Sequence, residues 1–277
     1  MRNHEVTEKQ FLLDKTGEIA EPGWARKQVW DYCRKMIKAP AIRIKEWDYY
    51  LVMGDGFAGC FTIADNGYMG LISVSLLSLD ENDPWEHTES IITPFPMGKF
   101  RLPESSSKGN VRYKDKRIDL KFLVKEGKRR IVCEFKDFWN GKPFFCDIVM
   151  KQPDMDTMTI ATPWDQKHAF YYNQKINCMH AKGYMVYDGK GHKLDDVTFH
   201  MPEDDILKPW KFTSSDGRFE MDFQPILDRA ALTDLKFLIS DQHQVFGKMT
   251  GKAVLDDGTV LEIKDVVCFA EKVRNRY

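Results

Sequence analysis

Long apolar runs, redox motifs and a sizeable net charge are all missing from this chain of 277 residues. It has no run of about 18 apolar residues, the length that a membrane-spanning helix needs, and its first residues lack the apolar core of a secretory signal. The six cysteines form no Cys-x-x-Cys pair, which excludes the common zinc and redox motifs. These absences predict a cytoplasmic protein with no membrane span, whose cysteines are reduced and mostly buried.

Signatures of nucleic-acid, cofactor and metal binding are lacking as well. The formal net charge of −1 argues against a nucleic-acid partner, and the basic cluster from Lys125 to Arg130 surrounds Gly127, as at the tip of a hairpin. No Gly-x-Gly-x-x-Gly, Walker loop or Gly-x-Ser-x-Gly occurs, and the histidines lack the compact spacing of metal ligands. We therefore expect no cofactor and no metal site.

Strand patterns take up most of the sequence from Lys45 onward. Apolar and polar residues alternate between strong turn signals, as antiparallel hairpins require. Four hairpins are predicted: residues 57–76 around Asp65-Asn66-Gly67, 118–135 around Gly127, 210–223 around Ser214–Gly217, and 249–263 around Asp256-Asp257-Gly258. A helix is predicted within Ala25–Ile37, where apolar residues have helical spacing before Pro40.

The number of predicted strands, about 15, favours a sandwich or barrel architecture and exceeds one small barrel. We expect an all-β protein with minor α content, built as two antiparallel halves. The boundary is placed near Pro163, which gives residues 1–163 and residues 164–277.

Six sequence blocks carry a resemblance to a known family. They are Lys45–Tyr50, Phe170–Met179, Gly191–Phe199, Trp210–Phe219, Asp241–Gly247 and Phe269–Val273. Together they resemble the bacterial family called domain of unknown function 2804, over nearly the whole chain. That family is distantly similar to the two-barrel, lipocalin-like (AttH-like) proteins, which include carotenoid hydratases and some fungal cyclases. The resemblance implies two lipocalin-like β-barrel halves with a pocket for an apolar ligand, and no particular substrate.

One segment departs from the family pattern. Members of the family carry a long Gly- and Trp-rich stretch where this chain has only residues 180–187 between Met179 and Asp188. The resemblance therefore implies an abbreviated second half, and it leaves open whether the barrel of that half closes. Such a half would expose strand edges, and a homodimer is one way of covering them.

The block Phe170–Met179 holds the first candidate site. If it forms one strand, Tyr171, Asn173, Lys175 and Asn177 share a face, because strand side chains alternate. Asn is depleted in strands, so two on one face suggest a strip that orients a ligand in a pocket. The alternative is an outer face in contact with water.

Three further segments supply candidate residues, each with a structural alternative. Asp165 and His168 could serve as acid and base, although Asp165 also suits a turn. Arg218 could clamp a carboxylate if its strand face points inward, and otherwise it meets water or cross-strand partners. Gln244 could contact a ligand beside His243, although lone histidines are more often structural.

These residues predict a protein that binds a small, largely apolar molecule. Cofactor-free acid–base chemistry such as hydration, isomerisation or cyclisation would follow, with Asp165 or His168 moving the proton. Tyr171 and Asn173 would orient the ligand, and Lys175 would meet a negative charge. The alternative is a non-enzymatic binding or scaffold protein, a truncated family relative without activity, and the sequence leaves both open.

Overall fold

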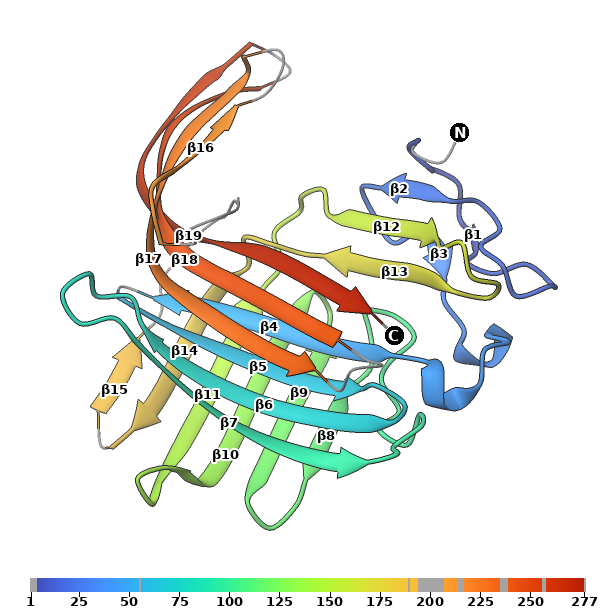
Figure 1. Ribbon diagram of the computed structural model, residues 1–277, viewed down its shortest axis with the longest axis horizontal. Helices are drawn as coiled ribbons and strands as arrows, with labels where there is room; N and C mark the ends of the chain where they lie inside the picture. The colour runs from blue at the N-terminus through green and yellow to red at the C-terminus, as the bar shows by residue number, and fades with distance from the viewer. Residues whose placement is uncertain are drawn as a thin grey trace. The chain divides into compact units, whose positions relative to one another are not determined.

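The computed structural model describes residues 4–54, 56–188, 190–193, 207–213, 217–234, 239–255 and 258–276 (Figure 1). Strands make up 62% of the structure and helix 3%, which confirms the all-β class. The helical segments of the described residues are two single turns, η1 (Arg34–Met36) and η2 (Ala41–Arg43). None of its sheets closes into a barrel within these ranges. No helix found there is long and apolar enough to cross a membrane.

The first large sheet has the strand order β4-β5-β6-β7. Its strands are β4 (Glu46–Gly54), β5 (Phe57–Asp65), β6 (Met69–Ser78) and β7 (Trp85–Pro94). Strands β5 and β6 form the first predicted hairpin, and Gly67 has the left-handed φ of +75° that its turn requires. Asp65, fully buried, accepts hydrogen bonds from the N–H groups of Gly67 (3.0 Å) and Gly98 (2.6 Å). Its carboxylate therefore holds the hairpin turn against the loop that follows β7.

The second large sheet has the order β15-β14-β11-β10-β9-β8. Its strands are β8 (Val111–Lys114), β9 (Ile118–Lys125), β10 (Lys128–Trp139), β11 (Lys142–Lys151), β14 (His180–Tyr187) and β15 (Lys190–Lys193). Lys125 pairs with Lys128, so Glu126 and Gly127 form a two-residue turn with φ of +52° and +70°. The second predicted hairpin is confirmed, with the basic cluster at its tip.

The inner face of this sheet is a continuous apolar layer. Phe122, Phe135 and Phe144 are all fully buried, and each alternates with outward-facing neighbours that are more exposed. The ring of Phe144 lies 6.2 Å from that of Phe61 on β5, and a Cβ on Gly59 would lie 2.5 Å from the sulfur of Met185. The glycine therefore allows β5 to pack closely on β14.

Gly183 on β14 makes a second close approach, to its neighbouring strand β11, which can be tested by mutation. Its φ is +149°, and a Cβ there would lie 2.1 Å from the backbone oxygen of Asp147, which cannot move aside without breaking the sheet. We expect Gly183→Ala to lower the free energy of unfolding by at least about 2 kcal/mol in urea titrations. Gly127→Ala is the control, because its φ is also positive but the space around it is open, and it should cost about 1 kcal/mol. Equal losses in the two variants would contradict the steric explanation.

The N-terminal region forms small sheets where the sequence predicted a helix. Its strands are β1 (Gln10–Phe11), β2 (Gly23–Ala25) and β3 (Trp30–Asp31), and β2 joins β12 (Met158–Pro163) and β13 (Phe170–Lys175) in the order β13-β12-β2. The prediction of a helix within Ala25–Ile37 was therefore wrong. Trp30 is fully buried, pairs with Gln10, and its indole donates to the carbonyl of Glu21 (3.1 Å). These long-range contacts outweigh the local helical spacing.

The strand expected over Phe170–Met179 is shorter than predicted. It ends at Lys175, and Cys178 has a φ of +57°, a left-handed conformation that breaks an extended strand. The chain turns there and enters β14, which belongs to the six-stranded sheet. Asn177 therefore lies beyond the strand and does not continue the face of Tyr171 and Asn173.

A separate four-stranded sheet has the order β16-β17-β18-β19. Its strands are β16 (Trp210–Thr213), β17 (Phe219–Asp234), β18 (Ile239–Val254) and β19 (Val260–Arg276). Trp210 pairs with Phe223 and Val254 with Val260, so the strands of the third and fourth predicted hairpins are confirmed. The predicted turn residues 214–216 and 256–257 lie outside the described residues. The buried hydrophobic cluster of this sheet includes Met221, Phe223 and Met249.

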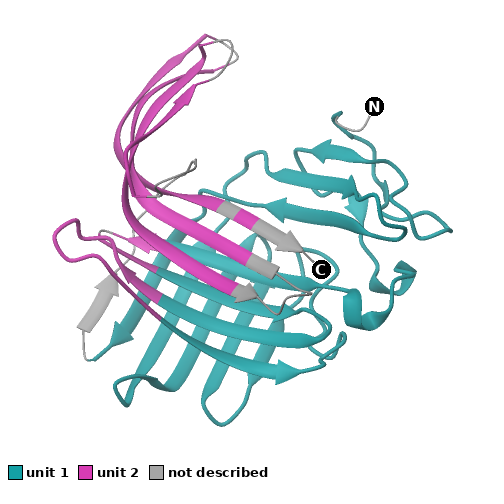
Figure 2. Ribbon diagram, in the orientation of Figure 1, with its two compact units in different colours: residues 1–52, 59–75, 88–195 teal, residues 53–58, 76–87, 196–277 magenta. Residues whose placement is uncertain are grey.

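The chain divides into two compact units (Figure 2). Unit 1 comprises residues 1–52, 59–75 and 88–195, and unit 2 comprises residues 53–58, 76–87 and 196–277. Pro163 ends β12 within unit 1. The division into residues 1–163 and 164–277 stays a prediction.

Candidate functional site

A row of polar side chains runs along one face of β4 in unit 1. Glu46, Asp48 and Tyr50 alternate with Trp47 and Tyr49, so the three share a face. With the residues that meet them they form what we call the Asp48 cluster, which consists of Tyr32, Arg34, Glu46, Asp48, Tyr50 and Arg129. All of its members belong to unit 1.

Arg129 supplies the buried positive charge of the cluster. It follows the turn of the β9–β10 hairpin, and its side chain, only 4% exposed, shares the inward face with Ile131 and Cys133. The guanidinium donates to the side-chain oxygen of Gln152 (2.7 Å) and to the carbonyl of Ser106 (2.7 Å). A buried charge is tolerated only when it is paired and hydrogen-bonded, and these acceptors meet part of that need.

Asp48 carries the negative charge that faces Arg129. Burial raises the pKa of this carboxyl to about 6, the charge of Arg129 lowers it, and the nearby charge of Glu46 raises it again. No described residue donates a hydrogen bond to the Asp48 carboxyl. A carboxyl with a pKa of about 6 changes its charge close to neutral pH, which is the property of a general acid or base.

Tyr50 lies next to this pair. Burial and the neighbouring Asp48 raise the pKa of its phenol to about 12, while the charge of Arg129 and a hydrogen bond to it lower that pKa. Its ring packs edge-on against Phe122, with the centroids 4.7 Å apart. The phenol therefore stays neutral at physiological pH and can donate or accept a hydrogen bond.

The other end of the cluster is built on Glu46. Its carboxylate accepts a hydrogen bond from the phenol of Tyr32 (2.6 Å). The same carboxylate forms a salt bridge with Nη1 of Arg34. Burial and the charge of Glu46 raise the pKa of Tyr32. The Nη2 group of Arg34 is buried and has no hydrogen-bond partner within the described part of the chain. Such a donor calls for a water molecule or a ligand.

The block Phe170–Met179 joins the cluster through a face different from the predicted one. Gln174 accepts a hydrogen bond from the hydroxyl of Ser106, whose carbonyl is held by Arg129. The sulfur of Met179 lies 3.9 Å from Nη1 of Arg129. Two of the blocks that carry the family resemblance, Lys45–Tyr50 and Phe170–Met179, therefore meet at Arg129.

The predicted strip on β13 lies at the edge of its small sheet. Tyr171 stacks at a tilt on Trp47, with the ring centroids 6.2 Å apart, and Asn173 is half-buried opposite Ile160. Lys175 and Asn177 are exposed. The roles of Tyr171, Asn173, Lys175 and Asn177 in ligand binding stay predictions.

Asp165 and His168 lie in the loop between β12 and β13. Asp165 is exposed, and His168 is half-buried with a left-handed φ of +56°. The carboxylate of Glu18 accepts the backbone N–H of His168 (3.0 Å) and lies 3.1 Å from its Nδ1. The carboxylate that touches His168 is thus that of Glu18, and the catalytic roles of Asp165 and His168 stay predictions.

Arg218 and Gln244 belong to unit 2. Arg218 directly precedes β17 and is half-buried. Gln244, 5% exposed, lies between Arg229 (3.4 Å) and Glu271 (3.3 Å) on the neighbouring strands. Its amide is satisfied within the sheet, and its predicted contact with a ligand, like that of Arg218, stays a prediction.

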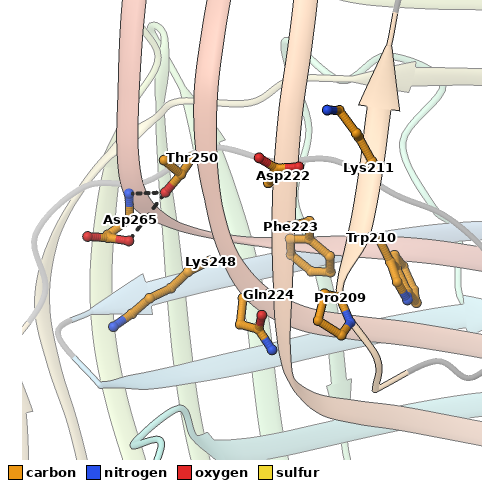
Figure 3. A pocket seen from close by; sticks show the side chains of 9 residues that line it. All are labelled: Pro209, Trp210, Lys211, Asp222, Phe223, Gln224, Lys248, Thr250 and Asp265. Atoms are coloured by element: carbon orange, nitrogen blue, oxygen red, sulfur yellow. Dashed lines mark hydrogen bonds between the residues drawn. The ribbon is translucent and has the colours of Figure 1, made fainter.

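Unit 2 also has a hollow of about 370 Å³ on its four-stranded sheet (Figure 3). Its lining residues are Pro209, Trp210, Lys211, Asp222, Phe223, Gln224, Lys248, Thr250 and Asp265. Lys248 forms a salt bridge with Glu81, and the hydroxyl of Thr250 and the N–H of Asp265 are hydrogen-bonded (2.9 Å). Because these groups already have partners, the hollow is a weaker candidate than the Asp48 cluster. No group of three metal-ligating side chains occurs in the described ranges.

The Asp48 cluster was missed at the level of sequence, although its signal was present. Arg129 was assigned to a basic hairpin tip, yet it has the same strand parity as Ile131, Cys133 and Phe135. Glu46 and Asp48 likewise have the parity of the buried Val52. Charged residues at inward positions of two strands were therefore the available signal.

The fold and this site define an all-β protein of several, mostly antiparallel, sheets with a largely half-buried polar cluster in unit 1. A family model described as a domain of unknown function (DUF2804) matches residues 3–190 and 184–277. The chain belongs to this family.

The two matched stretches overlap at residues 184–190, within and just after the segment 180–187 where the resemblance implies a shortening. No curated protein and no solved structure matched the chain. The bacterial origin and cytoplasmic location stay predictions.

Proposed function

We propose that this protein binds a small, largely apolar molecule beside the Asp48 cluster and that Asp48 exchanges a proton with it. The observation that carries this proposal is a carboxyl with a pKa of about 6, which lies near Arg129 and Tyr50 and receives no hydrogen bond from any described residue. The proposal retains the lipocalin-like arrangement that the resemblance implies, with the facing sheets of unit 1 as the pocket wall.

The surroundings of Asp48 suit such a ligand in two respects. Tyr50, whose ring packs on the buried Phe122, offers aromatic surface, and pockets for small molecules are mostly apolar with a few polar groups. The unpartnered Nη2 of Arg34 offers a donor for a carbonyl, hydroxyl or carboxylate oxygen of the ligand. The ligand would thus be apolar over most of its length and carry one oxygen function.

The chemistry would be a cofactor-free proton transfer. In its ionised form Asp48 would accept a proton from a carbon or hydroxyl of the ligand, and in its neutral form it would return the proton at another position. Arg129 would favour the ionised form, and Tyr50 would hold the reacting oxygen by a hydrogen bond. Isomerisation and cyclisation need only such transfers, and hydration needs in addition a water molecule that adds to the protonated ligand and gives its proton back to Asp48.

A thermal-shift screen with lipophilic alcohols, ketones, carboxylic acids and carotenoids tests this proposal. A compound that binds only the folded state raises the midpoint, by an amount that grows with its concentration. We expect one of these classes to do so, and we expect Asp48→Asn to reduce the shift at pH 7. Asp165→Asn is the matched control, because Asp165 is exposed and removing it should leave the shift unchanged.

The outcomes separate the rival explanations. A shift abolished by Asp165→Asn and unaffected by Asp48→Asn would place the site at the loop between β12 and β13. A shift that both variants retain, with no turnover of the ligand, would indicate a non-enzymatic binding protein. No shift with any of the four classes would contradict the proposal and favour a scaffold.

A further inference from the structure

The outer face of the six-stranded sheet carries an excess of basic side chains, although the net charge of the whole chain is close to zero. The registers align the outward residues of β8, β9, β10, β11 and β14 in rows across the sheet. These rows contain eight basic side chains and three acidic ones, and the acidic ones are Asp119, Glu134 and Asp147. The basic ones are Arg112, Lys114, Lys121, Lys125, Lys128, Arg130, Lys151 and Lys182. We call this surface the basic face.

Part of this charge is neutralised within the sheet and part is left over. Asp119 accepts two hydrogen bonds from Arg112 and lies within salt-bridge distance of Lys114 and Lys121, while Asp147 binds Arg130. Lys128, Lys151 and Lys182 are exposed and have no ion pair among the described residues. These three lie in the two rows nearest the β9–β10 turn, so the uncompensated charge is concentrated at one end.

Apolar side chains are interleaved with these bases. Phe145 (41% exposed), Val149 (38%) and Tyr184 (49%) lie on the adjacent strands β11 and β14. Leu123, Val132 and Val186 lie in the same rows and are half-buried. Val149 lies between Arg130 and Lys182, while Phe145 and Tyr184 pair with Glu134 and Asp147. Exposed apolar side chains that continue a row of bases are unusual on a sheet face that contacts only water.

We propose that the basic face docks on the surface of a membrane that contains anionic lipids. Lysines near such a surface are attracted to the lipid head groups, and aromatic side chains favour the interfacial layer. A single-stranded nucleic acid is the other polyanion to consider, but it needs a groove and mainly aromatic faces for stacking. Here the surface is a sheet face, and four of its six apolar side chains are aliphatic, which favours the lipid surface.

Flotation with unilamellar vesicles tests the inference on the full chain. The vesicles consist of phosphatidylcholine alone or with about 30% phosphatidylserine, at roughly 50 and roughly 500 mM salt. We expect binding to the anionic vesicles at low salt and its loss at high salt. The triple variant Lys128→Glu, Lys151→Glu, Lys182→Glu should bind about 100-fold more weakly.

A second triple variant separates position from net charge. Lys15→Glu, Lys27→Glu and Lys35→Glu change the charge by the same amount at exposed positions away from the basic face, and this variant should bind like the parent. Circular dichroism melts confirm that both variants fold. Equal losses in the two variants, or binding to neutral vesicles as strong as to anionic ones, would overturn the inference. Binding to a single-stranded oligonucleotide but not to the vesicles would overturn it as well, in favour of a nucleic-acid partner.

Discussion

Replacing Arg129 by Met lowers the free energy of unfolding by about 3 to 5 kcal/mol at pH 7, because it removes a buried, hydrogen-bonded charge and leaves the half-buried carboxylate of Asp48 without its counter-charge. Asp48 loses the positive charge that favours its ionised form, and the acceptors on Ser106 and Gln152 lose their donor. Met matches the length of the aliphatic part of Arg, so the loss reports the charge and the hydrogen bonds more than the packing. Urea unfolding followed by tryptophan fluorescence measures the change.

Arg130→Met is the matched control for this prediction. Arg130 is the next residue along β10, and its guanidinium makes two hydrogen bonds to the carboxylate of Asp147 on the outer face. Its side chain is 51% exposed, so the pair is screened by water and its removal should cost about 1 kcal/mol or less. If the two variants lose the same stability, Arg129 does not carry a buried charge of structural importance.

Replacing Asp48 by Asn removes the loss of folding stability that the parent suffers at higher pH, where the carboxyl of Asp48 is ionised. The folded pKa of Asp48, about 6, lies above the ordinary value of 3.8, so between these values the folded state holds more protons than the unfolded state. The stability of the parent therefore falls as the pH rises through this window, by about 2 to 3 kcal/mol in total. Asp48→Asn lacks this decline, so its stability relative to the parent should rise by that amount between pH 3.8 and pH 7.

Asp147→Asn is the control of opposite sign. Hydrogen bonds from Arg130 lower the pKa of Asp147, so its ionised form stabilises the folded state. That contribution is present above the ordinary pKa and is lost as the pH falls through the lowered one. Chemical denaturation at several pH values should therefore give slopes of opposite sign for the two variants. A flat difference between the parent and Asp48→Asn from pH 4 to pH 7 would contradict the prediction.

Local alternation and turn chemistry were sufficient to predict most of the sheet structure. The hairpin around Gly127 is an example, because apolar alternation and a left-handed turn residue agree on the same register. The segment Ala25–Ile37 was predicted wrongly for the converse reason. Its helical spacing is local, whereas Trp30 is buried through pairing with residues far away in the sequence. Such pairing cannot be deduced from spacing alone.

The candidate site depends even more on long-range structure. Arg129 and Asp48 are separated by about 80 positions, and nothing in either strand alone indicates that their inward faces meet. The strand parity of each residue could have identified it as an inward charge. Which inward charges face each other is decided by the packing of the β4 face on the β9–β10 hairpin, through contacts such as Tyr50 on Phe122.

The basic face could not be predicted from the sequence for a related reason. A net charge of −1 averages over the chain, while the registers of five strands place eight bases on one surface. The prediction of no nucleic-acid partner rests on that average and stays a prediction. Charge per sheet face is therefore the more informative quantity for this protein.

The central claim is that Asp48 titrates near neutral pH inside the protein. Its side-chain carboxyl carbon, assigned by comparison with Asp48→Asn, can be followed by ¹³C NMR between pH 3 and pH 8. We expect a midpoint of about 6, and we expect it to move when a ligand from the thermal-shift screen is added. A midpoint near the ordinary aspartate value of 3.8, unmoved by any ligand that binds, would contradict the assignment of this cluster as the functional site.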